Sequence, residues 1–131
     1  ELFARYGEDY FRRIEHETLC RYVAQPDLIL SPGGGAVLQE ANRAVMRVHC
    51  LVVCLTAQPD VILCRVEQDK TVRPVLEQRE PGQSKLERIE QVLAERRTCY
   101  QEADLVLDTS HASIEELTEQ VLLWLKEQAG A

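Results

Sequence analysis

The 131-residue sequence contains no long apolar run, and its charges are mostly acidic. No stretch approaches the roughly 18 apolar residues that a transmembrane helix needs, and no charged-then-apolar leader opens the chain. Acidic residues outnumber Lys and Arg by 22 to 15, for a formal net charge of -7, whereas general nucleic-acid binding requires clustered cations. We therefore expect a cytoplasmic protein with no nucleic acid and no membrane as partner, in which a bound anion meets a local group of arginines.

The sequence also lacks the residue patterns of metal and thiol chemistry. Its five cysteines include no Cys-x-x-Cys pair and no histidines at zinc-ligand spacing, which favours reduced thiols over a disulfide framework or a direct metal site. The histidines His16, His49 and His111 lie far apart, and none stands beside a nucleophile. A histidine-driven catalytic triad therefore has no support, and we expect the three histidines at the surface.

The sequence does contain an alternation of helix-period segments and short, solid apolar runs. This alternation predicts a single α/β domain over residues 1–131 with a parallel sheet. Helices are expected at residues 8–24, 39–48, 59–65, from 84 onward and 113–128, and strands at 28–31, 51–56 and 105–107. Residues 67–83 show no sustained period and are predicted to form a long surface loop of the length usual for a lid, with disorder as the alternative.

The most informative run is Leu28 to Gly35, in which an apolar stretch leads directly into Gly33, Gly34 and Gly35. Consecutive glycines lack Cβ atoms, so their amide N–H groups can approach an anionic or hydroxyl-rich small molecule closely. Ligands of open α/β sheets gather at the carboxyl ends of the strands. A flexible turn explains three glycines at least as often, so the prediction of a binding loop depends on its charged neighbours.

Arg12 and Glu15 are the first candidate neighbours, since residues three apart project from one helix face. A guanidinium offers a fork for a carboxylate or phosphate, and the adjacent carboxylate can accept hydrogen bonds from hydroxyls. The alternative is a solvent-exposed ion-pair ladder with Glu8, which would contribute well under about 1 kcal/mol.

Three further arginines are candidates for contacts with a ligand. Arg73 lies in the predicted lid, where Pro74 fixes its backbone, and a mobile arginine there could neutralise a transferring phosphate. Arg96 lies four residues before Tyr100, so the two side chains are neighbours on one helix face. The alternative to a ligand contact is that Arg96 is a surface residue covering an aromatic ring that packs inward. Arg65 could stack on a flat base or simply face water.

Together these residues resemble the shikimate kinase family. The resemblance covers nearly the whole chain and is carried by Gly7-Glu8, Phe11-Arg12-Arg13-Ile14-Glu15, Ser31-Pro32-Gly33-Gly34-Gly35, Arg73-Pro74, Arg96 to Tyr100 and Asp108-Thr109. It implies a three-layer P-loop kinase-like fold of the nucleoside-monophosphate-kinase type, with a parallel sheet and helices on both faces, lacking its first strands. The implied activity is transfer of the γ-phosphoryl group of ATP to the 3-hydroxyl of shikimate with Mg²⁺, in aromatic amino acid biosynthesis.

The resemblance also implies roles for the substrate-binding residues. Arg12 and Arg96 would hold the shikimate carboxylate, and Glu15 would bond a ring hydroxyl. The amides of residues 33–35, chiefly those of Gly34 and Gly35, would complete the substrate pocket.

On the nucleotide side, the resemblance implies that Arg73 closes from the lid onto substrate and phosphate. Arg65 would pack against adenine, and Ser31 would touch a water molecule of the Mg²⁺ shell. No direct metal ligand is expected.

The sequence departs from the family in one major respect, because it contains no Gly-x-x-x-x-Gly-Lys-Ser/Thr loop to cradle the phosphates. We therefore expect an amino-terminally incomplete sequence, lacking roughly 30 residues or more of one βαβ unit and competent only with the missing loop. The sheet would lack the strand that lies between residues 28–31 and 51–56. We expect one of three outcomes: the gap stays open, the two flanking strands pair directly, or further residues of the chain supply the missing strand. Smaller departures are Pro32 and Thr98-Cys99.

Two other functions stay open from the sequence. One is a catalytically inactive kinase-like module that binds a hydroxy acid or a protein partner. The other is a different small-molecule kinase, such as a gluconate kinase, which fits the architecture but accounts less well for the pairing of Phe11-Arg12-Arg13-Ile14-Glu15 with three glycines. We expect the complete enzyme to be a monomer.

Overall fold

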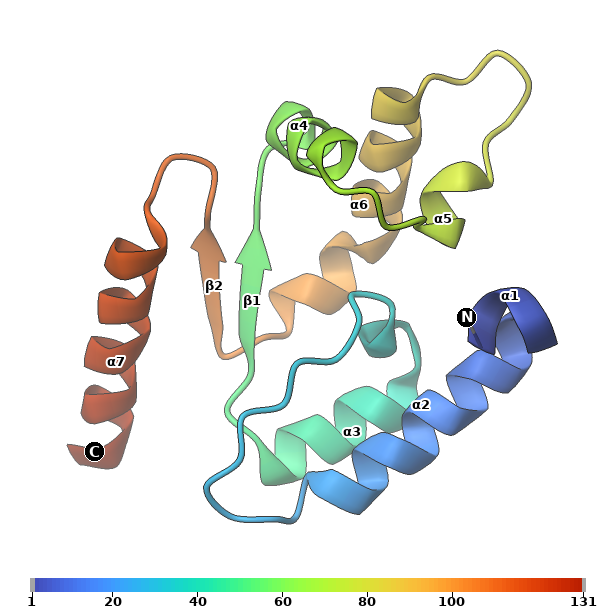
Figure 1. Ribbon diagram of the computed structural model, residues 1–131. Helices are drawn as coiled ribbons and strands as arrows, with labels where there is room; N and C mark the ends of the chain where they lie inside the picture. The colour runs from blue at the N-terminus through green and yellow to red at the C-terminus, as the bar shows by residue number, and fades with distance from the viewer. Residues whose placement is uncertain (1, 131) are drawn as a thin grey trace.

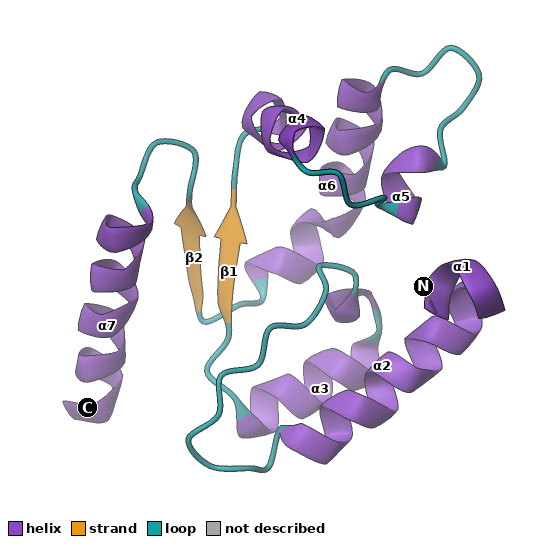
Figure 2. Ribbon diagram, in the orientation of Figure 1, coloured by secondary structure: helices purple, strands orange, loops and turns teal. Residues whose placement is uncertain are grey.

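The computed structural model describes residues 2–130, with side chains from Ala4 onward, so the two end residues of the predicted 1–131 domain lie outside the described part. Helices dominate the structure (Figure 2). In chain order the elements are α1 (Leu2–Tyr6), α2 (Glu8–Tyr22), the 3₁₀ helix η1 (Ala36–Leu38), α3 (Glu40–His49), β1 (Val53–Thr56), α4 (Pro59–Gln68), α5 (Pro74–Glu77), α6 (Lys85–Gln101), β2 (Leu105–Asp108) and α7 (Ile114–Gly130).

The two strands form a parallel pair, with Val53 opposite Leu105 and Thr56 opposite Asp108. Parallel strands require a crossover connection, which α4, α5 and α6 supply. Figure 1 shows β1 and β2 side by side in the middle of the molecule, with α7 beside β2. The parallel α/β arrangement predicted from the alternating pattern is therefore present.

The predicted strand at residues 28–31 is wrong, because this segment is irregular in the structure. An extended segment becomes a strand only when a neighbour pairs with its N–H and C=O groups. Within residues 2–130, β1 pairs with β2 alone. Of the three outcomes expected for the gap beside β1, the structure shows the open gap. Ile29 and Leu55, which flank it, are 96% and 62% exposed.

The other elements match their predictions with shifted ends. β1 begins at Val53 rather than at 51, and α4 continues to Gln68 rather than stopping at 65. Two serines begin helices as their capping boxes predict: the Ser84 hydroxyl accepts from the Glu87 N–H, and the Ser113 hydroxyl accepts from the N–H three residues later. These local signals were sufficient because a cap involves only neighbouring residues.

The predicted lid contains a one-turn helix, α5, rather than only loop. Pro74 favours this turn because its fixed φ suits the first position of a helix. The turn is held on α6, where Arg88 Nε donates to the Val75 carbonyl at 3.0 Å. Lys85 adds an ion pair with Glu77 at 3.6 Å.

The main hydrophobic core lies between α2, η1 and α3, which pack side by side (Figure 1). Its buried members are Leu19, Val23, Ala36 and Met46. Ala36 is completely buried, so the segment that follows the glycines is fixed against α2 and α3. Among residues 2–130, none of the helices combines the length and apolar character that crossing a membrane requires.

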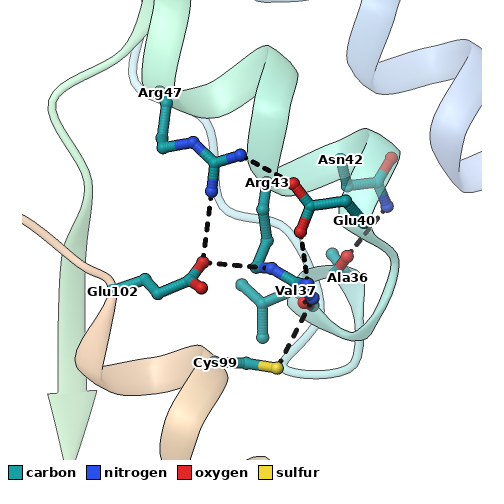
Figure 3. A network of polar contacts seen from close by, with 8 residues as sticks. All are labelled: Ala36, Val37, Glu40, Asn42, Arg43, Arg47, Cys99 and Glu102. Carbon is teal, nitrogen blue, oxygen red and sulfur yellow. Dashed lines mark hydrogen bonds and ion pairs between the residues drawn. The ribbon is translucent and has the colours of Figure 1, made fainter.

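A charged network joins the start of α3 to the end of α6 (Figure 3). Arg43 contacts Glu40 at 2.5 Å and Glu102 at 3.0 Å, the latter an ion pair through Nε without hydrogen-bond geometry. Arg47 contacts the same two carboxylates at 2.7 and 3.3 Å. Hydrogen bonds from Arg47 and Arg43 lower the pKa of Glu40. The network keeps the end of α6 next to η1.

Candidate binding site around the glycine loop

The glycine loop, residues 33–35, lies against two side chains of α2. If Gly33 carried a Cβ atom, that atom would lie 3.6 Å from Glu15 Oε2. At Gly35 the same atom would lie 2.7 Å from Arg12 Nη1, which is too close for a real contact. Arg12 and Glu15 therefore face the loop together, on the helix face that their spacing predicts.

The opposite side of the loop lies against α6. A Cβ atom on Gly34 would lie 3.0 Å from the Tyr100 hydroxyl oxygen and 3.4 Å from Arg96 Nη1. The Tyr100 hydroxyl donates to the Gly34 carbonyl at 3.0 Å. Arg96 and Arg12 come from helices far apart in the sequence, and the structure brings both to the glycines.

The two arginines differ in how their charges are compensated. Arg12 lies 3.0 Å from Glu15 and 3.7 Å from Glu8, and its side chain is only 12% exposed. The ion pairs of the alternative interpretation are thus present, but they hold Arg12 at the loop rather than in open solvent. Arg96 has no carboxylate partner among residues 2–130, and its hydrogen bond goes to the neutral Tyr100 hydroxyl at 3.3 Å.

The backbone of the loop presents hydrogen-bond donors rather than acceptors. Each carbonyl of residues 33–37 accepts a bond from within the protein. The carbonyls of Gly33 and Gly35 accept from the N–H groups of Ala36 at 3.0 Å and Leu38 at 3.1 Å. Side chains bond the other three carbonyls: Tyr100 that of Gly34 at 3.0 Å, Asn42 that of Ala36 at 2.8 Å, and Arg43 that of Val37 at 2.6 Å. By contrast, the N–H groups of Gly34 and Gly35 have no acceptor within the described part of the chain. Such a surface suits carboxylate or hydroxyl oxygens.

Asn42 is a structural determinant of the site that the sequence-based reasoning missed. Its side chain is fully buried, and its Nδ2 donates to the Ala36 carbonyl (Figure 3). Its Oδ1 lies 2.6 Å from His16 Nδ1, so that nitrogen carries the proton. The prediction that His16 lies at the surface is therefore wrong, because this bond holds the ring half-buried between α2 and α3. The available signal was a polar residue on the apolar face of α3, beside Met46.

Arg65 and Arg73 lie outside this cluster, since neither bonds the glycine loop within the described residues. Arg65 donates to the hydroxyl and the carbonyl of Thr109, both at 2.8 Å. Thr109 in turn donates through its hydroxyl to the Thr56 carbonyl at 2.8 Å, so Arg65 fastens the carboxyl ends of β1 and β2. Arg73 pairs with Asp69 at 2.9 Å in the predicted lid.

An open cleft of about 300 Å³ adjoins the loop between α2 and residues 30–33. Ser31, Gly33 and Glu15 contribute to its lining together with apolar side chains of α2. No group of three or more His, Cys, Asp or Glu side chains within residues 2–130 is arranged to hold a metal ion.

Solved structures share this fold. A shikimate kinase from Acinetobacter baumannii in complex with shikimate matches with a TM-score of 0.84 and 28% identity, over 97% of this chain and 69% of the other. A shikimate kinase from Bacteroides thetaiotaomicron matches with a TM-score of 0.75 and 26% identity, over 99% and 73%. The predicted class, a P-loop kinase fold with a parallel sheet, is confirmed.

The sequence comparisons are equally specific. A family model described as shikimate kinase matches residues 1–126. The shikimate kinase of Salinibacter ruber is 40% identical over 132 residues, covering 98% of this chain and 64% of the relative. That of Thermoanaerobacter pseudethanolicus is 35% identical over 122 residues, covering 93% and 68%. The chain belongs to the shikimate kinase family, and it spans about two thirds of the length of these relatives.

Proposed function

We propose that this chain binds shikimate at the glycine loop and acts in the ATP-dependent phosphorylation of its 3-hydroxyl. The observation that carries the proposal is the meeting of Arg12, Glu15 and Arg96 at a loop whose backbone offers donors. A small polyhydroxy acid needs guanidinium groups for its carboxylate, with backbone and carboxylate partners for its hydroxyls. The shikimate bound to the Acinetobacter baumannii relative supports the same ligand class.

Each side chain has a distinct task in this proposal. Arg96, which lacks an acidic partner within residues 2–130, attracts the substrate carboxylate, and Arg12 supplies a second guanidinium. Glu15 accepts a hydrogen bond from a ring hydroxyl. The N–H groups of Gly34 and Gly35 donate to substrate oxygens, and together these contacts fix the ring in one orientation.

The proposal includes ATP as the phosphoryl donor and Mg²⁺ as its counter-ion, both on the basis of family membership. The printed sequence has no Gly-x-x-x-x-Gly-Lys-Ser/Thr loop, and side chains within residues 2–130 form no metal-binding group. The described residues therefore offer Mg²⁺ no direct set of His, Cys, Asp or Glu ligands. Their contribution is to orient the acceptor, on which this reaction depends strongly.

The nucleotide contacts are part of the proposal as well. Arg65 lies exposed at the carboxyl ends of the strands, where ligands of α/β sheets gather. Its bonds to Thr109 use the edge of the guanidinium, and the flat face is suited to stacking on adenine. We assign residues 67–83 as the lid that carries Arg73, and Ser31 to a water of the Mg²⁺ shell.

Isothermal titration of the full chain with shikimate tests the proposal. Arg12→Ala and Arg96→Ala should each raise the dissociation constant by about tenfold or more, since a hydrogen bond to a charged group contributes about 1.5–3 kcal/mol. Arg97→Ala is the matched control, because Arg97 is an exposed neighbour on α6. Unchanged affinity in both test variants would contradict the assignment, and a preference for gluconate over shikimate would favour the other kinase.

A binding or regulatory module without catalysis is the second candidate, because the contacts at the glycine loop are suited to holding a ligand and do not by themselves require a transfer step. The coding sequence upstream of Glu1 separates the two. A strand followed in frame by a Gly-Lys-Ser/Thr loop supports the kinase, and a start codon at this point supports the module.

We also propose a cytoplasmic location and a monomeric enzyme. Five free cysteines support a reducing compartment. Cell fractionation and analytical ultracentrifugation test the two statements, and a sedimenting dimer would contradict the second.

A further inference from the structure

Tyr100 connects Arg96 to the glycine loop through a single hydroxyl group. Tyr100 lies one helical turn after Arg96, so the two side chains are neighbours on α6. Its hydroxyl donates to the Gly34 carbonyl at 3.0 Å and accepts from Arg96 Nη1 at 3.3 Å. The direction of both bonds is fixed, because a carbonyl can only accept and a guanidinium can only donate.

The two arginines at the loop are therefore held by different means. Carboxylates hold Arg12, and they cancel much of its positive charge. Arg96 is held by a neutral phenol, with no acidic partner within residues 2–130. A neutral orienting group restricts a long, flexible side chain without reducing the charge that is available to an anion.

We propose that Tyr100 is a positioning residue that acts through Arg96: its hydroxyl, anchored on the Gly34 carbonyl, holds the guanidinium beside the glycine loop for a carboxylate ligand. This inference rests on the proposed shikimate-binding function. It assigns Tyr100 no contact with the substrate. Its effect on affinity comes from restricting Arg96 before the ligand arrives.

Tyr100→Phe is the direct test because it removes only the hydroxyl. We expect the dissociation constant for shikimate, measured by isothermal titration, to rise about fivefold to tenfold, the range expected for one lost hydrogen bond. Tyr6→Phe is the matched control, since Tyr6 is an exposed tyrosine on α1. Unchanged affinity of Tyr100→Phe would overturn the inference.

A double-mutant cycle separates positioning from a general structural role. If Tyr100 acts through Arg96, adding Tyr100→Phe to Arg96→Ala should change affinity by less than about twofold. A purely structural role, in which the hydroxyl only holds α6 against the loop, would give the same loss in both backgrounds. That result would overturn the inference.

A measurement without ligand distinguishes failure of the inference from failure of the proposed function. Side-chain ¹⁵N relaxation should give Arg96 Nε a higher order parameter than the neighbouring Arg97, and Tyr100→Phe should lower it to the level of Arg97. If the wild type binds no shikimate, the proposed function fails while this measurement still decides the role of Tyr100. Equal mobility of Arg96 in wild type and variant would overturn it.

Discussion

Replacing Gly35 by alanine tests whether the loop needs glycine for space or for backbone freedom. Gly35 has φ -83° and ψ -7°, a conformation that any L-residue adopts readily. An added Cβ atom would lie 2.7 Å from Arg12 Nη1 and 2.8 Å from Cζ, whereas ordinary contact begins at 3.4 Å. Nη2 would lie closer still, so the guanidinium would have to retreat by about 1 Å to restore contact distance. Glycine is therefore required here by the close approach of Arg12.

The expected loss is in binding rather than in folding. Arg12 is anchored on Glu15 at 3.0 Å, so a retreat moves it relative to that anchor and to the ligand. Losing one charge-assisted bond costs about 1.5–3 kcal/mol, or about 10- to 150-fold in the dissociation constant for shikimate. The folded state should change by less than about 1 kcal/mol, because alanine also restricts the unfolded chain, by about 0.4–1 kcal/mol.

The three glycines form a graded series for the assay. A Cβ on Gly33 would meet Glu15 at an ordinary 3.6 Å, and one on Gly34 would meet the Tyr100 hydroxyl at 3.0 Å. Shikimate titration and thermal unfolding of the three alanine variants should therefore show near-normal binding for Gly33→Ala, weaker binding for Gly34→Ala and the weakest for Gly35→Ala. Equal losses in all three would refute the reasoning, since the loop would then depend on flexibility.

Three further predictions concern the surroundings of the loop. Asn42→Leu leaves the buried Ala36 carbonyl and the half-buried His16 Nδ1 without their partner, and it should lower the free energy of unfolding by about 2–4 kcal/mol. Urea denaturation measures this, and a loss below about 1 kcal/mol would contradict the role of this side chain. Burial raises the pKa of the Cys54 thiol, so mass spectrometry should show slower alkylation of Cys54 than of the exposed Cys20 at neutral pH; equal rates would argue against the burial. The pKa of Glu40 is lowered in the folded protein, so the stabilisation that this carboxylate provides is complete above its ordinary pKa of 4.5 and is lost as the pH falls through the lower folded value. Urea denaturation of Glu40→Gln should therefore show a smaller loss of stability in acid than the wild type. An unchanged acid response would show that Glu40 is not the source of that loss.

The helices and their starts could be predicted because the signals that define them are local. The capping box at Ser84 involves residues within one turn, and the apolar period of α2 lies within its own sequence. The strand expected at residues 28–31 could not be decided in this way. Its apolar run is suited to a buried strand, but a strand also needs a paired neighbour, and pairing is a property of distant chain.

The same distinction applies to the site. The spacing of Arg12 and Glu15 and the run of glycines are visible in the sequence, and the structure brings them together. The carbonyl contacts of Asn42 and Tyr100 were missed because side-chain bonds to a distant backbone follow no period. For Asn42 the sequence held a usable clue, since an amide on the apolar face of a helix must find a buried partner.

The acidic composition and the arginine site are complementary rather than contradictory. With a net charge of -7, the surface as a whole repels large polyanions at moderate salt. Arg96 has no acidic partner within residues 2–130 and lies beside a loop with free N–H donors, so a positive charge remains available to a ligand at this one place. Because the repulsion acts on any extended anion and the attraction acts only at the loop, this arrangement favours a small carboxylate ligand over nucleic acid. Neutralising Arg96 with an acidic partner would remove the attraction and keep the repulsion, which is why its orientation by an uncharged phenol matters.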